Sequence, residues 1–204
     1  MTIFQITPAT SVTTTAAGGD AFYSDTPGTD SLIVNAGAHL RAQGDASFGA
    51  FLNNTGGWKV AVNGIIRSDK SIGVSFQFND AAASTIFVGV AGEVHGGTIG
   101  IFDENAVSIV NAGKIYGAST AIVVDGLSAH TINNVGQLIG GVHAIIGGFN
   151  TEALTNSGFV AGKIALQEGN DRLKNSNVIF DLVDMGDGDD TVTNAKPAAM
   201  HDDV

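Results

Sequence analysis

Cysteine is absent from this chain of 204 residues, so disulfide bonds and thiolate metal sites are excluded. Basic residues are scarce as well: 9 Lys and Arg stand against 20 Asp and Glu, for a formal net charge of −11. Without a stripe of basic residues the chain cannot neutralise the phosphates of a nucleic acid, and we expect no such partner. Divalent cations suit an acidic surface better, although solubility alone also explains the charge.

Long apolar runs are missing too. No uncharged apolar stretch approaches roughly 18 residues, so we expect no membrane span. Residues 1–8 lack a basic region followed by an apolar run, so we expect no cleavable signal peptide. Helical periodicity is nearly absent, because glycine interrupts it in every window of about 12 residues. What remains is a hydrophobic share of 44% with 28 glycines, which indicates a folded, β-rich chain rather than a disordered one.

A short motif repeats along the chain. The pattern Asn-x-Gly-x-(Ile/Leu/Val)-x-Gly occupies residues 111–117, 134–140 and 156–162. Its central glycines recur after 23 and 22 residues (136 − 113 and 158 − 136). A constant step of this size in β-prone sequence is typical of a solenoid, in which each repeat forms one coil stacked on the previous one.

Each coil contains three short apolar runs, which predicts a triangular parallel β-helix. Looser early copies of the motif, with glycines at 37, 64 and 92, are spaced by 27 and 28 residues, whereas the last asparagines are 19 apart. We therefore predict an all-β parallel β-helix, or β-solenoid, with coils of about 19–28 residues. Its expected parts are an N-terminal cap at 1–29, β-helix coils at 30–166, calcium-binding coils at 167–194 and a tail without a strand at 195–204.

The asparagine of the motif has a structural interpretation. Asparagine tolerates the left-handed backbone of tight turns, and its amide can bond to the same side chain one coil away. We therefore predict a ladder of stacked amides that holds the coils together. Its members are Asn111, Asn134, Asn156 and Asn175, with Asn194 as a further candidate.

A second column of polar residues follows the second apolar run of each coil. Asp and Asn are common turn residues, so turn preference explains this column without a ligand. A cation-binding edge is the sharper interpretation. The column comprises Asp80, Asp103 with Glu104, Asp125, Asn150, Asp171 and Asp190.

Two acidic glycine turns end the repeat. They approach the nonapeptide Gly-Gly-x-Gly-x-Asp-x-apolar-x, in which glycine lets carbonyls turn inward and Asp supplies carboxylates to Ca²⁺. The second turn lacks only the first glycine, and the first lacks both leading glycines. Their aspartates are 19 residues apart (190 − 171), about one coil, so they can face a shared ion. The candidate ligands are Glu168, Gly169, Asn170 and Asp171, then Gly186, Asp187, Gly188, Asp189 and Asp190.

Over roughly residues 30–194 the chain resembles secreted bacterial proteins that join such a β-helix to hemolysin-type (RTX) calcium-binding turns. The resemblance implies a secreted or cell-surface location, export by a type I-like route and folding assisted by Ca²⁺. The chain departs from that family in having only two such turns, one of them degenerate, and in losing the motif after Asn194.

These observations favour a non-catalytic, extracellular calcium-binding β-helix that serves as a structural or adhesive module, with a carbohydrate or cell-surface ligand as a candidate partner. A polysaccharide lyase or glycosidase is the alternative, since Asp103, Glu104 and Asp125 can supply two carboxylates about 5–10 Å apart. Against it, the basic residues are scattered and the five histidines occupy different places in the repeat. End-to-end self-association of the solenoid is a third possibility.

Overall fold

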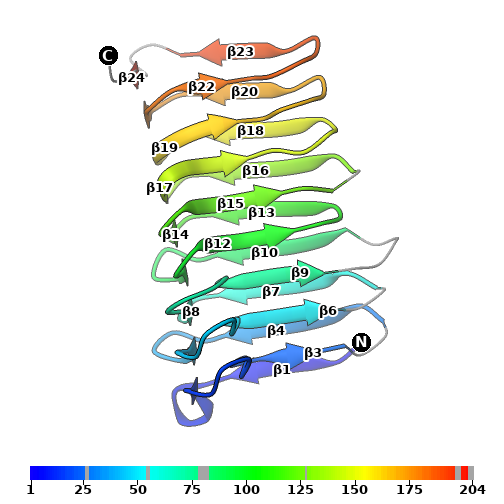
Figure 1. The fold of residues 1–204 in the computed structure, drawn as a ribbon, viewed down its shortest axis with the longest axis vertical. Helices are drawn as coiled ribbons and strands as arrows, with labels where there is room; N and C mark the ends of the chain where they lie inside the picture. The colour runs from blue at the N-terminus through cyan, green and yellow to red at the C-terminus, as the bar shows by residue number, and fades with distance from the viewer. Residues whose placement is uncertain (26–27, 54–55, 78–82, 127, 196–198, 202–204) are drawn as a thin grey trace.

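The computed structural model describes residues 1–25, 28–53, 56–77, 83–126, 128–195 and 199–201. The chain forms a β-solenoid whose coils lie one on another, with the two termini at opposite ends (Figure 1). All strand pairs are parallel, and among the described residues the only helical segment is the short η1 (Pro8–Thr10). The predicted all-β parallel β-helix is confirmed.

The first face of the solenoid is a nine-stranded parallel sheet, to which each coil contributes one strand. Its strands follow one another in chain order. They are β1 (Ile3–Ile6), β4 (Asp30–Val34), β7 (Trp58–Val62), β10 (Ser84–Val88), β13 (Val107–Asn111), β16 (His130–Asn134), β18 (Glu152–Asn156), β20 (Arg172–Asn175) and β23 (Thr191–Asn194).

The other two faces belong to one 15-stranded sheet. The second face holds β2 (Val12–Thr14), β5 (His39–Ala42), β8 (Ile65–Ser68), β11 (Glu93–Gly96), β14 (Lys114–Gly117), β21 (Val178–Phe180) and β24 (Ala199–His201). The third face holds β3 (Tyr23–Ser24), β6 (Ala50–Asn53), β9 (Val74–Gln77), β12 (Ile99–Asp103), β15 (Thr120–Val124) and β22 (Val183–Asp184). Two long strands, β17 (Gln137–Ile146) and β19 (Phe159–Ala165), run through both faces and join them.

Both ends of the chain take part in the stack. Residues 1–29, expected to form a cap, contain β1, β2 and β3, which pair with β4, β5 and β6. In the tail, the expectation of no strand is wrong for Ala199–His201, because β24 pairs with β21. The strand forms because its backbone continues the second face by one more coil.

The core is built from side chains that alternate inward along each short strand, as parallel pairing in register requires. One inward column of the first face is aliphatic through successive coils and at most 3% exposed. It contains Leu32, Val60, Ile86, Ile109, Ile132, Leu154 and Leu173.

The corner between the first and second faces explains the glycine of the motif. A Cβ atom added at Gly113, Gly136 or Gly158 would lie 2.2 Å from a carbonyl oxygen of the coil below. Real Cβ atoms do not approach backbone so closely, so only glycine permits a two-residue turn at this stacking distance. The repeat spacing seen in the sequence therefore marks a steric requirement of the corner.

Candidate cation-binding edge

The asparagine ladder at the end of the first-face strands is confirmed. Each side-chain Nδ2 donates to Oδ1 of the next asparagine at 2.8 Å, in four consecutive bonds from Asn111 to Asn194. The first four members are fully buried. Satisfied amides in a buried column replace bonds to water and fix the register of the coils. The ladder amides bind one another, so their role is structural.

The ladder begins only at the fifth strand of the first face. Its column is occupied in the three preceding coils by Val34, Val62 and Val88. Asn35 and Asn63, which belong to the early copies of the motif, lie one residue beyond it. A shift of one residue moves a side chain to the other side of a strand, so those copies do not extend the ladder.

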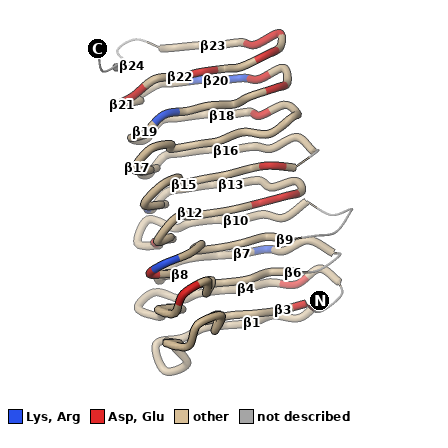
Figure 2. The backbone as a smooth tube through the Cα atoms, viewed as in Figure 1, with Lys and Arg blue, Asp and Glu red and all other residues tan. Residues whose placement is uncertain are grey.

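The turns from the third face to the first face form an acidic edge. Figure 2 shows Asp and Glu residues gathered at this edge of the stack, most densely toward the C-terminal end. Asp103 and Glu104 lie in one turn, and Asp125 lies in the turn of the next coil, where its N–H donates to the Asp103 carbonyl at 2.9 Å. Asp80 lies outside the described residues.

The two glycine turns predicted to bind calcium stack on each other. Glu168 and Asp187 form a parallel bridge, and the Asp187 N–H donates to the Gln167 carbonyl at 2.6 Å. The Asp189 N–H donates to Oδ1 of Asn170 at 2.8 Å. All nine predicted ligand residues therefore lie in one pair of adjacent turns, in the expected register of 19 residues.

The backbone of the first turn matches the second despite its missing glycine. Gln167 has φ +70°, beside φ +84° for Gly186, and Gly169 at +136° lies against Gly188 at +149°. A non-glycine residue at positive φ is strained, and Gln167 offsets the strain with a bond from Nε2 to the Gly147 carbonyl at 2.6 Å. The degenerate turn thus keeps the left-handed geometry of the motif.

Acidic side chains at the start of the first-face strands form a file in which each binds the coil below. Oδ1 of Asp190 accepts the Asp171 N–H, and Oδ1 of Asp171 accepts the Glu152 N–H, both at 2.8 Å. Glu152 and Asp171 are at most 1% exposed. Within the described part of the chain, both Glu152 carboxylate oxygens and Oδ2 of Asp171 form no hydrogen bond of good geometry. The two carboxyl groups nevertheless lie close enough to each other, and Glu152 close enough to the Gly148 backbone, for these contacts to influence their pKa values.

These two buried carboxyls have raised pKa values. Burial, followed by the charge of Asp171, raises the pKa of Glu152 to about 8. Burial raises the pKa of Asp171, and the charge of Asp190 adds to that rise. A carboxylate inside a protein without a counter-charge either holds its proton or binds a cation. We therefore expect these carboxyl groups to be either protonated or bound to a cation.

Sequence reasoning missed Glu152 and chose Asn150 instead. Asn150 lies opposite Gly169, where its carbonyl approaches the glycine, and Glu152 lies in the Asp171 file. Gly147 and Gly148 lie five and four residues before Glu152. Leu166 and Gln167 hold the same places before Asp171, so residues 147–152 form a third turn of the stack. Counting one 19-residue coil back from Asp171 would have found Glu152. An open hollow of about 480 Å³ lies over these three turns, lined by Phe149, Asn150, Thr151, Glu168, Gly169, Asn170, Asp187 and Gly188.

The carboxylates proposed for catalysis are arranged differently. Asp103 is fully buried beside His130, with its Oδ2 3.8 Å from Nδ1 of the imidazole. Burial, with a further contribution from the charge of Glu104, raises the pKa of Asp103 to about 7. Burial lowers the pKa of His130 to about 4. Asp103, enclosed in the core, cannot touch a polysaccharide on the surface, whereas Glu104 is half-buried and Asp125 is exposed. Burial raises the pKa of Glu104, and the charge of the neighbouring Asp125 adds to that rise.

Across the residues that are described, no three His, Asp or Glu side chains converge where they could hold a metal ion. An ion at the acidic edge would thus depend on turn carbonyls as well as carboxylates, as Ca²⁺ sites commonly do. No helix in the described segments is long and apolar enough to cross a membrane. No protein-family model, curated protein or solved structure matches the chain, so the resemblance to RTX proteins rests on the motif residues alone.

Proposed function

We propose that this chain is a non-catalytic calcium-binding β-solenoid that acts outside the cell as a structural or adhesive module. The observation that carries the proposal is the file of Glu152, Asp171 and Asp190 at the end of three stacked turns, whose first two members are buried. Both carboxylate oxygens of Glu152 and Oδ2 of Asp171 form no hydrogen bond of good geometry within the described residues, and residues at positive φ turn the adjoining backbone. Hard oxygen ligands of this kind are what Ca²⁺ prefers.

The calcium role follows from the electrostatics of the edge. Adjacent carboxylates repel one another, and burial strengthens the repulsion because the local dielectric is low. A divalent cation between the turns would remove this repulsion. It would stabilise the last coils, because their stacked turns place acidic side chains next to one another. Such a site, with few charged ligands, suits the high calcium concentrations found outside cells.

Calcium titration of the purified protein tests the proposal. We expect Ca²⁺ at millimolar concentration to raise the unfolding temperature and to bind with measurable heat in calorimetry, because it binds only the folded state. Asp171→Asn should abolish this response, since the amide keeps an oxygen to accept the Glu152 N–H but loses the charge. Asp45→Asn, a change of equal charge in an exposed residue near the other end, is the control and should respond like the wild type.

An unchanged unfolding temperature in Ca²⁺, with no heat of binding, would remove the metal from the proposal. The extracellular location is supported by the resemblance and is checked separately, by measuring the protein in the culture medium and in the lysate of the cells that produce it. The non-catalytic role is checked by incubation with acidic polysaccharides, where no release of reducing ends or unsaturated products is expected.

A further inference from the structure

The second face of the solenoid carries two outward files of side chains that run along its axis. Successive members of a file come from successive coils, and the two files are two residues apart along each strand. The residues between them point inward and are fully buried, as at Leu40, Ile66 and Val94. Stacked strands are about 4.8 Å apart, so each file is a regular row on the surface. One file contains Thr13, Arg41, Arg67, His95 and Tyr116, and the other contains His39, Ile65, Glu93, Lys114, Gln137 and Phe159.

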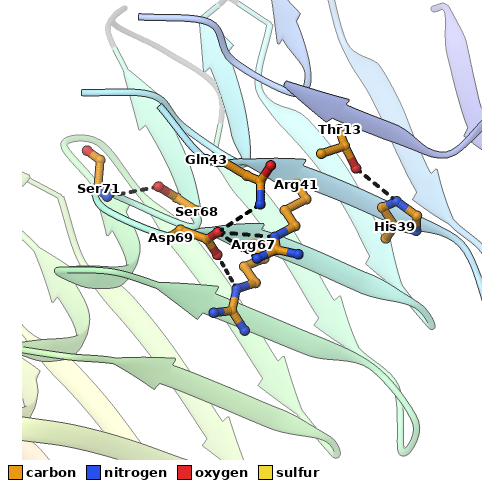
Figure 3. Close-up of polar contacts among 8 residues, drawn as sticks. All are labelled: Thr13, His39, Arg41, Gln43, Arg67, Ser68, Asp69 and Ser71. Carbon is orange, nitrogen blue, oxygen red and sulfur yellow. Dashed lines mark hydrogen bonds and ion pairs between the residues drawn. The ribbon is translucent and has the colours of Figure 1, made fainter. Parts of the chain in front are cut away.

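Two arginines from adjacent coils meet at one carboxylate on this face (Figure 3). Arg41 donates to Oδ2 of Asp69 through Nη2 at 2.7 Å and Nε at 3.2 Å, and Arg67 donates through Nε to Oδ1. Burial alone would raise the pKa of Asp69, but the bonds from Arg41 and Arg67 outweigh it and lower the pKa to about 2. The carboxylate therefore stays ionised and holds the two guanidinium groups side by side with a net positive charge.

The arginine pair borders one of two surface hollows that share Glu93 in their lining. A depression of about 290 Å³ is lined by Thr13, His39, Arg41, Ile65, Arg67 and Glu93. A groove of about 540 Å³ continues from Glu93 along the glycine corner, past Lys114 and Gln137 to Phe159. Together the two hollows, which we call the trough, follow the solenoid axis over several coils.

The lining indicates what the trough holds. Arginine forks match carboxylates in a bidentate way, and both arginine side chains remain 40% exposed while bound to Asp69. Ile65 and Phe159 are 40% and 37% exposed and offer apolar contacts along the same row. A densely charged polyanion such as a nucleic acid is repelled by a chain of net charge −11, so a polymer with sparser acidic groups fits better.

We propose that this trough binds an extended acidic polysaccharide, with Arg41 and Arg67 holding a carboxylate of the sugar chain. Lys114 lies further along the trough, 3.9 Å from Glu93, and provides a second positive contact. The inference is independent of the calcium proposal, since the acidic edge and the second face share no residue. It supplies the ligand surface that an adhesive role requires.

Affinity electrophoresis and calorimetry with hyaluronan oligomers, which carry one carboxylate per disaccharide, test the site, with dextran as the neutral comparison. Both are carried out in EDTA, because carboxylated polymers bind calcium themselves. We expect the wild type to bind the uronate and not dextran, with affinity that falls as salt rises. The double change Arg41→Gln and Arg67→Gln should weaken binding about tenfold or more, since charge-assisted hydrogen bonds are lost.

The matched control is the double change Arg172→Gln and Lys174→Gln, which removes the same charge from exposed residues of β20 on the first face. It should bind like the wild type. Because the arginines also anchor Asp69, a second variant, Ile65→Glu, places a negative charge in the trough at an exposed residue. Its counterpart is Phe87→Glu, at a residue 45% exposed on the first face.

We expect Ile65→Glu to weaken binding and Phe87→Glu to leave it unchanged, while circular dichroism shows both folded. Absence of uronate binding by the wild type overturns the proposal, and so does equal loss in both members of either pair. Binding that persists in EDTA while calcium gives no thermal response would sustain the trough and reject the calcium function.

Discussion

The first coils and the last coils solve the same stacking problem with different chemistry. In the first face, the column that ends each strand is Val34, Val62 and Val88 in the early coils and asparagine from Asn111 onward. Bonds between equivalent positions of adjacent coils give the coil lengths. The Thr2 N–H donates to Asp30, 28 residues later, in the first coil, whereas Asn156 donates to Asn175, 19 residues later, near the end. Hydrophobic packing and a polar ladder are thus alternative ways to stack coils in one solenoid.

The shortening has a clear structural origin. In early coils a loop separates the second-face strand from the third-face strand, as between Ala42 and Ala50. In later coils that loop is gone, and β17 and β19 turn the corner as single strands. Directional amide bonds fix the strand register at one corner of the coil. This suits a short coil, because it has few loop residues that could accommodate a shift in register. An apolar column fixes register less strictly and accompanies longer loops.

The largest expected effect comes from breaking the ladder at its centre. Asn134→Ala would leave Nδ2 of Asn111 and Oδ1 of Asn156 each without a ladder partner in a buried site. Nδ2 of Asn111 still donates to the Gln137 carbonyl and Oδ1 of Asn156 still accepts the Gly158 N–H. The loss of two buried hydrogen bonds, together with the cavity left by the amide, should lower the free energy of unfolding by about 3 kcal/mol. Chemical denaturation measures the loss, with Asn133→Ala at the adjacent exposed residue as the control. Equal stability of the two variants would show that the ladder does not hold the coils.

The repeat made this ladder predictable, because each asparagine recurs at the same place before a glycine. The same signal misled in the early coils, where Asn35 and Asn63 resemble the motif but lie one residue past the column that Val34 and Val62 fill. Strand register depends on a single residue, and composition does not reveal it. Burial was also hidden: Glu152 looks like any surface acid in the sequence and is enclosed only when the coils stack.

A pair of substitutions sharpens the contrast between the two columns. Oδ1 of Asn111 is buried without a partner in the described structure, directly above Val88. Val88→Asn would supply a donor to it and extend the ladder by one coil, whereas Val62→Asn buries an amide between two valines. We expect Val62→Asn to be less stable than Val88→Asn by about 2 kcal/mol in denaturant unfolding. The reverse order would contradict the idea that the ladder can grow downward.

The acidic file makes the stability of the later coils depend on pH. Without calcium, folded Glu152 keeps its proton up to a pKa of about 8, while the unfolded group loses it near 4.5. The folded state therefore binds more protons, and stability falls as pH rises through this window. Asp103, with its pKa raised to about 7, also lowers the stability as pH rises. His130, with its pKa lowered from 6.5 to about 4, has the opposite effect, but only below pH 6.5.

Between pH 6.5 and 8 the free energy of unfolding should thus decline, at up to about 1.4 kcal/mol per pH unit for a single carboxyl. Thermal unfolding in EDTA across this range measures the slope. Glu152→Gln should flatten it, and Glu168→Gln, at an exposed residue of the neighbouring turn, should not. A wild-type stability that rises over this range would mean that the file is ionised and already compensated.

The smallest effect concerns backbone strain, which both ends of the solenoid contain. Ala46, in an early loop, has φ +52°, and Gln167, in a late turn, has φ +70°. Ala46 is exposed, so Ala46→Gly should relieve the left-handed strain and stabilise the fold by about 0.5 kcal/mol after the added flexibility of the unfolded chain. Gln167→Gly relieves similar strain but loses the bond to the Gly147 carbonyl, and we expect no gain. Differential scanning calorimetry resolves the pair, and a gain for Gln167→Gly would show that its side-chain bond contributes nothing to the late turns.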